Sequence, residues 1–105
     1  MSASGRLGLR GGPFLEITMV SLRYPTGAEC PKCQEARQYL AGRGLLEQIS
    51  QCLHAEDGNP ESEGVRLAAE HGMTRFPFFV VSDGDEQRVY SSVVKLVREV
   101  LAPPA

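Results

Sequence analysis

The sequence predicts an α/β domain in which a mixed four-stranded sheet is flanked by three helices. Strand-like and helix-like patterns alternate along the 105-residue chain in the order β-α-β-α-β-β-α. In addition, two cysteines stand three positions apart where the first strand pattern gives way to the first helix pattern. A chain of this length accommodates one domain with a single modest core.

The first strand is expected over residues 14–24, FLEITMVSLRY, which are rich in β-branched and aromatic residues. Its apolar positions change phase midway, as expected of a strand that is buried on both faces or carries a bulge. The first helix is expected over residues 31–43, because Pro31 suits the first helical turn and apolar residues recur at helical spacing. Gly42 and Gly44 supply its stop.

The later elements follow from shorter signals. Residues 45–55 fit both helical and alternating spacing, and we expect a strand over residues 49–55. The second helix is expected to begin with Asn59 as N-cap and Pro60 at the first helical position. Strands over residues 78–82 and 87–90 are joined by the turn signal Asp83-Gly84. Ser91 or Ser92 then caps the last helix.

Composition narrows the classes of function. A formal net charge of −2 gives no basis for binding nucleic acid or a membrane surface, and no apolar run is long enough to span a bilayer. Three cysteines are too few for a secreted disulfide framework, so a reducing, cytoplasmic location is expected. Residues 1–13 lack the apolar core of a secretory signal and are expected to form a flexible tail before a domain at residues 14–102.

The stretch Glu29-Cys30-Pro31-Lys32-Cys33 contains the candidate reactive residues. Cys30 is expected at a helix start, where free N–H groups and the helix dipole favour a thiolate, the form that attacks disulfides. Cys33 lies within reach, which is typical of a redox pair. Glu29 is expected to be a loop charge, with proton acceptance as the alternative.

The alternative interpretation of C-x-x-C is half of a zinc site. Its remaining ligands would come from Cys52, His54 and His71, but the sequence holds no second C-x-x-C and no H-x₃₋₅-H. This spacing favours the redox interpretation, so no bound metal is expected. Cys52 is expected in the core, and both histidines are expected to be structural.

The layout, with C-P-K-C after the first strand, resembles the thioredoxin superfamily and, in size, the glutaredoxins. A second match runs from Gly72 to Val81, GMTRFPFFVV, and resembles the segment that carries the family's cis-proline. The resemblance covers about residues 15–101. It implies a thioredoxin-like fold, with Pro77 in the cis conformation opposite the cysteine pair.

The resemblance also implies the roles of the site residues. Cys30 would be the nucleophile, and Cys33 the resolving thiol that releases the mixed disulfide. The expected substrate-binding residues surround this pair: Lys32, Thr74, Arg75, Phe76 and Pro77. Among them, Lys32 would stabilise the thiolate, with a solvated lysine that points away as the alternative. Arg75 would meet a carboxylate of the substrate or of glutathione, with an ordinary surface arginine as the alternative.

Two departures from the family pattern shape the expected function. Glu29 stands where tryptophan commonly precedes the cysteine pair, and Tyr90-Ser91-Ser92-Val93 replaces the Gly-Gly and acidic pair of glutaredoxins. We therefore expect a dithiol oxidoreductase that reduces protein or small-molecule disulfides and holds no cofactor permanently. Its electrons would come from glutathione or a thioredoxin-type reductase. The alternatives are an iron–sulfur or metal-binding module and a redox-inert adaptor.

Overall fold

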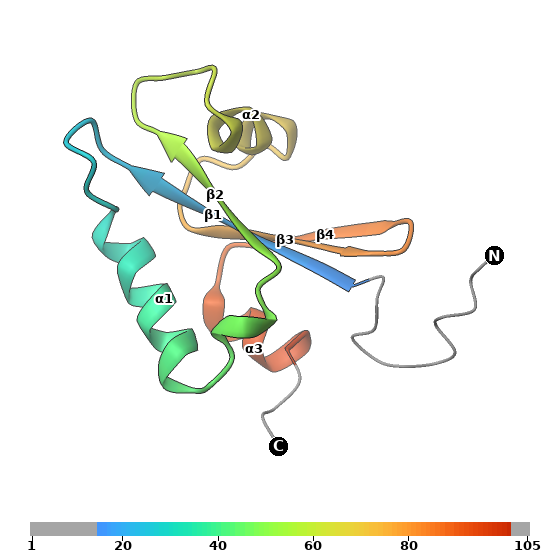
Figure 1. Ribbon diagram of the computed structural model, residues 1–105. Coiled ribbons are helices and arrows are strands. Elements are labelled where there is room, and N and C mark those ends of the chain that lie inside the picture. Colours follow the sequence, from blue (N-terminus) through green and yellow to red (C-terminus); the bar gives the residue numbers. More distant parts are fainter. Residues whose placement is uncertain (1–14, 102–105) are drawn as a thin grey trace.

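The structure, a computed structural model, describes residues 15–101 and contains one four-stranded sheet and three α-helices (Figure 1). The strands are β1 (Leu15–Arg23), β2 (Gln51–Glu56), β3 (Phe78–Asp83) and β4 (Glu86–Tyr90). The helices are α1 (Pro31–Gly42), α2 (Glu63–Glu70) and α3 (Val93–Glu99), with a 3₁₀ turn η2 (Leu46–Gln48) before β2. The tail predicted for residues 1–13 lies outside the described residues.

The sheet has the strand order β2-β1-β3-β4. β1 and β2 are parallel, whereas β3 runs antiparallel to both β1 and β4. Helices α1 and α3 cover one face of the sheet and α2 covers the other (Figure 1). This arrangement confirms the predicted thioredoxin-like fold, a mixed four-stranded sheet flanked by three helices. Within residues 15–101, no helix is long and apolar enough to cross a membrane.

The central strands are buried on both faces, which explains the phase change in the first strand pattern. In β1, every residue from Ile17 to Ser21 is buried. Met19 packs in the cluster beneath α1 and α3, whereas its neighbour Val20 packs in the cluster beneath α2. In β3, Phe79 and Phe78 divide between the two clusters in the same way. Apolar residues at consecutive positions are therefore required here.

The ambiguous segment at residues 45–55 contains both kinds of structure. Leu46–Gln48 form the 3₁₀ turn, and the strand β2 begins only at Gln51. Buried Leu45 and partly buried Ile49 bracket the turn, and both pack on the α1 side of the core. A short helical turn followed by an edge strand thus explains why the apolar spacing in this segment fits both patterns.

The predicted start of the second helix is wrong. The Asn59 side chain accepts a hydrogen bond from the N–H of Glu61 at 3.0 Å, which makes a local turn rather than a helix cap. Pro60 lies within that turn, and α2 begins at Glu63 with Ser62 as its N-cap residue. An Asn-Pro pair fits a turn as well as a helix start, and the turn is favoured here. Ser92, by contrast, caps α3 as predicted, accepting from the N–H of Lys95 at 3.2 Å.

Helix α2 approaches β2 most closely at Gly64, which is buried. A methyl group at this position would lie 2.5 Å from the carbonyl carbon of His54 and against the backbone of Ala55. Strand backbone cannot move aside as a flexible side chain would. Glycine at this position is therefore required by the contact between helix and sheet.

We predict that Gly64→Ala lowers the free energy of unfolding by about 3 kcal/mol, the upper end for an overpacked core site. Gly42→Ala is the matched control, because a methyl group at this other helical glycine meets no atom within 4 Å. It should be neutral or stabilise the protein by up to about 1 kcal/mol. Urea unfolding of both variants makes the comparison, and equal stabilities would show that the close approach does not constrain α2.

Candidate active site

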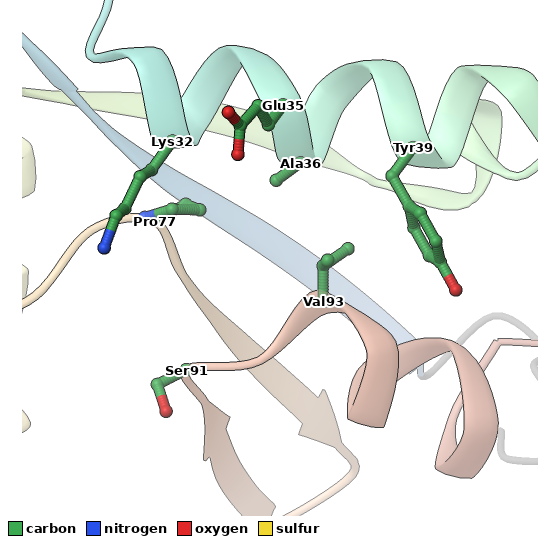
Figure 2. Close-up of a pocket in the computed structure, with 7 residues that line it drawn as sticks. All are labelled: Lys32, Glu35, Ala36, Tyr39, Pro77, Ser91 and Val93. Atoms are coloured by element: carbon green, nitrogen blue, oxygen red, sulfur yellow. The ribbon is translucent and has the colours of Figure 1, made fainter.

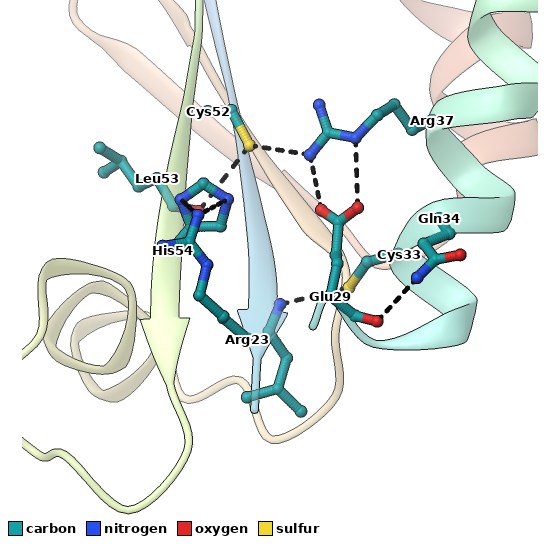
Figure 3. Close-up of polar contacts among 9 residues, drawn as sticks. Arg23, Glu29, Cys33, Gln34, Arg37, Cys52, Leu53 and His54 are labelled. Carbon is teal, nitrogen blue, oxygen red and sulfur yellow. Dashed lines mark hydrogen bonds and ion pairs between the residues drawn. The ribbon is translucent and has the colours of Figure 1, made fainter. Parts of the chain in front are cut away.

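The two cysteines lie where α1 begins, beside the C-terminal end of β1. Cys30 is the N-cap residue of α1, and Pro31 is its first helical residue, as predicted. The N–H of Cys30 donates to the carbonyl oxygen of Leu22 at 2.8 Å. The N–H of Leu22 in turn donates to the sulfur of Cys33 at 3.3 Å (Figure 3). One residue of the buried strand thus contacts both members of the pair.

The two thiols have opposite acidity. Burial of the fully enclosed Cys33 raises the pKa of its thiol to about 12, although the Leu22 N–H favours the thiolate. Partial burial also raises the pKa of Cys30, but hydrogen bonding from the Tyr24 hydroxyl and from the N–H groups of Lys32 and Cys33 outweighs it. The pKa of Cys30 is therefore lowered overall. Cys30 is the accessible, acidic thiol and Cys33 the enclosed, weakly acidic one.

Tyr24 reaches Cys30 because the loop after β1 folds back on itself. The N–H of Tyr24 donates to the carbonyl oxygen of Ala28 at 2.8 Å, and Gly27 donates to the carbonyl oxygen of Tyr24 at 2.8 Å. Gly27 has a φ of 93°, a conformation that side chains disfavour. The hydrogen bond to Cys30 raises the pKa of Tyr24, so its hydroxyl stays protonated and donates. Sequence reasoning missed Tyr24, because only the Pro-Thr-Gly-Ala loop signal hints at this fold-back.

A groove of about 270 Å³ lies beside the start of α1 (Figure 2). It brings together two of the predicted substrate-binding residues, Lys32 and Pro77, which both line it. The Phe76–Pro77 peptide bond is cis, which confirms that prediction. Further lining comes from residues outside the predicted set: Glu35, Ala36, Tyr39, Ser91 and Val93.

The other predicted substrate-binding residues lie outside the lining of this groove. Thr74 and Arg75 are exposed in the connection that leads to the cis-proline. Phe76 is partly buried and packs against Phe78, with ring centroids 5.6 Å apart. Lys32 meets the Cys30 sulfur through its backbone N–H. Stabilisation of the thiolate by its ammonium group stays a prediction.

A polar cluster flanks the cysteines on the β2 side of α1 (Figure 3). Arg37 on α1 forms an ion pair with Glu29 at 2.6 Å and donates to the sulfur of Cys52 at 3.4 Å. Nearby, the Arg23 guanidinium lies 3.1 and 3.2 Å from the two ring nitrogens of His54. Among residues 15–101, no three His, Cys, Asp or Glu side chains are grouped to hold a metal ion.

We predict that Cys30 is alkylated rapidly near neutral pH, whereas Cys33 requires strongly alkaline solution. The lowered pKa of Cys30 leaves thiolate present at neutral pH, and the pKa of about 12 keeps Cys33 protonated there. Iodoacetamide rates against pH on Cys33→Ser and Cys30→Ser measure each thiol separately, with Cys52→Ser added to both. Rapid alkylation of the Cys30→Ser protein in mildly acidic solution would reverse the assignment.

We further predict that Tyr24→Phe raises the pKa of Cys30, because the hydroxyl donor to its sulfur is lost. Alkylation should slow at mildly acidic pH and keep the same limiting rate in alkaline solution. Tyr39→Phe removes a hydroxyl from the groove instead and serves as the control. An unchanged pH profile in Tyr24→Phe would exclude this hydrogen bond.

Comparisons with known proteins give limited similarity. No protein-family profile matches the chain. No curated protein matches it either. Among solved structures, the chain is similar to the solution structure of a thioredoxin from Thermus thermophilus, with 21% sequence identity and a TM-score of 0.44 over 80% of this chain and 70% of that one. The strand order, the helices on both faces and the cis-proline of the chain itself give it a thioredoxin-like fold.

Proposed function

We propose that this protein is a thiol–disulfide oxidoreductase that reduces disulfides through Cys30 and Cys33. The observation that carries the proposal is the opposed acidity of the two thiols within one helical turn. An acidic, accessible thiol suits attack on a disulfide, and an enclosed neighbouring thiol suits release of the mixed disulfide. The groove beside Pro77 provides a surface for the substrate.

In the first step the Cys30 thiolate attacks one sulfur of the substrate disulfide. A bond forms between Cys30 and that sulfur, the substrate disulfide breaks, and the departing thiolate takes a proton from water. Before the attack, the Tyr24 hydroxyl and the N–H groups at the start of α1 stabilise the thiolate. The product is a mixed disulfide between Cys30 and the substrate.

In the second step Cys33 loses its proton and attacks the sulfur of Cys30. The bond between Cys30 and the substrate breaks, the second substrate thiol departs, and a disulfide joins Cys30 to Cys33. The substrate gains two electrons from the protein and two protons in total. The proton lost by Cys33 balances one of them and water supplies the other, because Cys30 reacts as a thiolate. A dithiol donor then reverses the process and restores both cysteines.

The groove and the connection before it suit a protein disulfide better than one small peptide. Thr74 and Arg75 are exposed next to the cis-proline, so their backbone is accessible to an extended chain. Ser91 places a side chain in the groove where glutaredoxins carry glycine. We propose that a cytoplasmic protein disulfide is the substrate, that a thioredoxin-type reductase is the main electron donor, and that glutathione is a slow one. No cofactor is held permanently in this scheme.

We predict that turnover of a protein disulfide requires both cysteines. With a thioredoxin-type reductase as donor, Cys30→Ser should lose all activity and Cys33→Ser at least about tenfold, because the mixed disulfide then accumulates. Cys52→Ser, the same substitution at the third cysteine, should retain activity. Glutathione should support turnover of the wild-type protein only slowly.

Other outcomes would point to other functions. A Cys33→Ser variant that keeps most of its activity with glutathione would show a monothiol mechanism. Failure of every disulfide and donor to cycle the thiols would favour a redox-inert adaptor. Iron content and visible absorption after anaerobic purification would favour a cluster-binding module, in which case both cysteines would be needed for iron retention.

A further inference from the structure

The ion pair between Glu29 and Arg37 joins the loop before the cysteines to the helix after them. Glu29 directly precedes Cys30, and Arg37 lies four residues after Cys33 on α1. Its Nη2 donates to Oε2 of Glu29 at 2.6 Å, and its Nε donates to Oε1 at 3.3 Å. Both carboxylate oxygens are therefore occupied by one planar guanidinium, the strongest geometry for such a pair.

Further contacts hold both partners in place. Nη2 of Arg37 also donates to the Cys52 sulfur on β2 at 3.4 Å, which links the guanidinium to the edge strand (Figure 3). The carbonyl oxygen of Glu29 accepts from the Gln34 side chain at 2.9 Å, and the backbone of Glu29 pairs with that of Arg23. The side chains of Glu29 and Arg37 are only 18% and 35% exposed, so solvent weakens their attraction less than at an open surface.

Other groups also face the Glu29 carboxylate. The Ser21 hydroxyl on β1 is fully buried and helps to lower the pKa of Glu29, although among residues 15–101 it has no hydrogen-bond partner of normal geometry. His54 on β2 adds a weaker effect, and its own pKa is lowered by burial and by Arg23. The largest effect on the pKa of Glu29 is the hydrogen bonding from Arg37, which lowers it against the opposing effect of burial.

The charge of Glu29 also acts on the thiol pair. It contributes to the raised pKa of Cys33, together with burial and the neighbouring Cys30. A carboxylate beside an enclosed thiol has two chemical options. It can exchange protons with that thiol, or it can stay ionised as a fixed charge that opposes formation of the second thiolate.

We propose that Arg37 is a positioning residue that holds Glu29 as a permanent negative charge and so keeps this carboxylate out of the proton transfers of Cys30 and Cys33. The inference rests on the proposed function. A carboxylate with both oxygens bonded to a guanidinium is a weak base, because protonation would break a charge-assisted hydrogen bond. The proton of Cys33 therefore passes to water when its sulfur bonds to Cys30, and the departing substrate thiolate takes a proton from water.

Loss of the guanidinium should return Glu29 to proton exchange. In Arg37→Met the Glu29 carboxylate stays partly buried but loses the guanidinium that stabilised its charge. The pKa of Glu29 should therefore rise, because burial is no longer opposed by the ion pair. Glu29 would then titrate at higher pH than in the wild-type protein. The double variant Arg37→Met/Glu29→Gln removes the titrating group and should abolish the new ionisation.

The kinetic test follows the second step in single turnovers with an aromatic disulfide that releases one chromophore in each step. In the wild-type protein, the second release should accelerate about tenfold per pH unit through the acidic and neutral range, because only the Cys33 thiolate reacts. Arg37→Met should add an inflection to this profile, and Arg37→Met/Glu29→Gln should lack it. Cys52→Ala removes the other acceptor of Nη2 and should retain the wild-type profile.

Two kinetic results would overturn the proposal. One is an Arg37→Met profile identical to that of the wild type. The other is a wild-type inflection that disappears in Glu29→Gln, which would show that the carboxylate already exchanges protons. Arg37→Lys keeps the charge without the two-point contact, and it replaces Arg37→Met if that variant fails to fold.

A titration that needs no turnover separates this proposal from the proposed function. The ¹³C chemical shift of the Glu29 carboxyl in the reduced protein should titrate with a midpoint below about pH 4.3, the midpoint of an ordinary glutamate. In Arg37→Met it should titrate above that pH. If no protein, including the wild type, releases the second chromophore, the proposed function fails while this titration still tests the role of Arg37. A wild-type Glu29 that titrates at or above the ordinary value would overturn it.

Discussion

The hydrogen bonds of Leu22 connect the buried sheet to the chemistry of the protein. Leu22 is a partly buried residue of the central strand β1, and it packs against the core clusters on both faces of the sheet. Its carbonyl oxygen fixes the start of α1 at Cys30, and its N–H fixes the sulfur of Cys33. One residue of β1 therefore holds the backbone of Cys30 and the sulfur of Cys33.

The same geometry explains how two identical side chains acquire different properties. Cys30 lies before the first turn of α1, where main-chain donors and Tyr24 face its sulfur. Cys33 lies within the first turn, against the core, where desolvation dominates. Three residues of separation on a helix are therefore enough to move one thiol from solvent into the interior. The Glu29–Arg37 ion pair places a carboxylate charge near these two thiols.

The sequence predicted most of the fold, because its strongest signals are local. β-Branched runs, the Asp83-Gly84 turn and the Ser92 cap each specify their own segment. The cis conformation at Pro77 followed from the family resemblance. The predicted start of α2 was wrong because Asn59 and Pro60 suit a turn as well as a helix, and in the structure Asn59 forms a turn with Glu61.

The candidate site was less predictable, because its partners are distant in sequence. The cysteines were found from their spacing, but Tyr24 reaches Cys30 only through the fold-back at Gly27. Arg37 and Cys52 are fifteen residues apart, and they meet only because β2 lies beside β1 under α1. Contacts between side chains on different elements depend on how those elements are aligned and oriented. Local sequence patterns do not specify that arrangement.

The position of Tyr24 links the surroundings of one tyrosine to the state of the Cys30 sulfur. The chain has three tyrosines and no tryptophan, so tyrosine alone determines its near-ultraviolet emission. Tyr24 donates to the Cys30 sulfur while that sulfur is a thiolate, and this acceptor is lost once the sulfur is bonded to Cys33. Tyr39 and Tyr90 lie in the groove and in the core, away from this exchange. We therefore expect oxidation of the thiol pair to change the tyrosine fluorescence of the unlabelled protein.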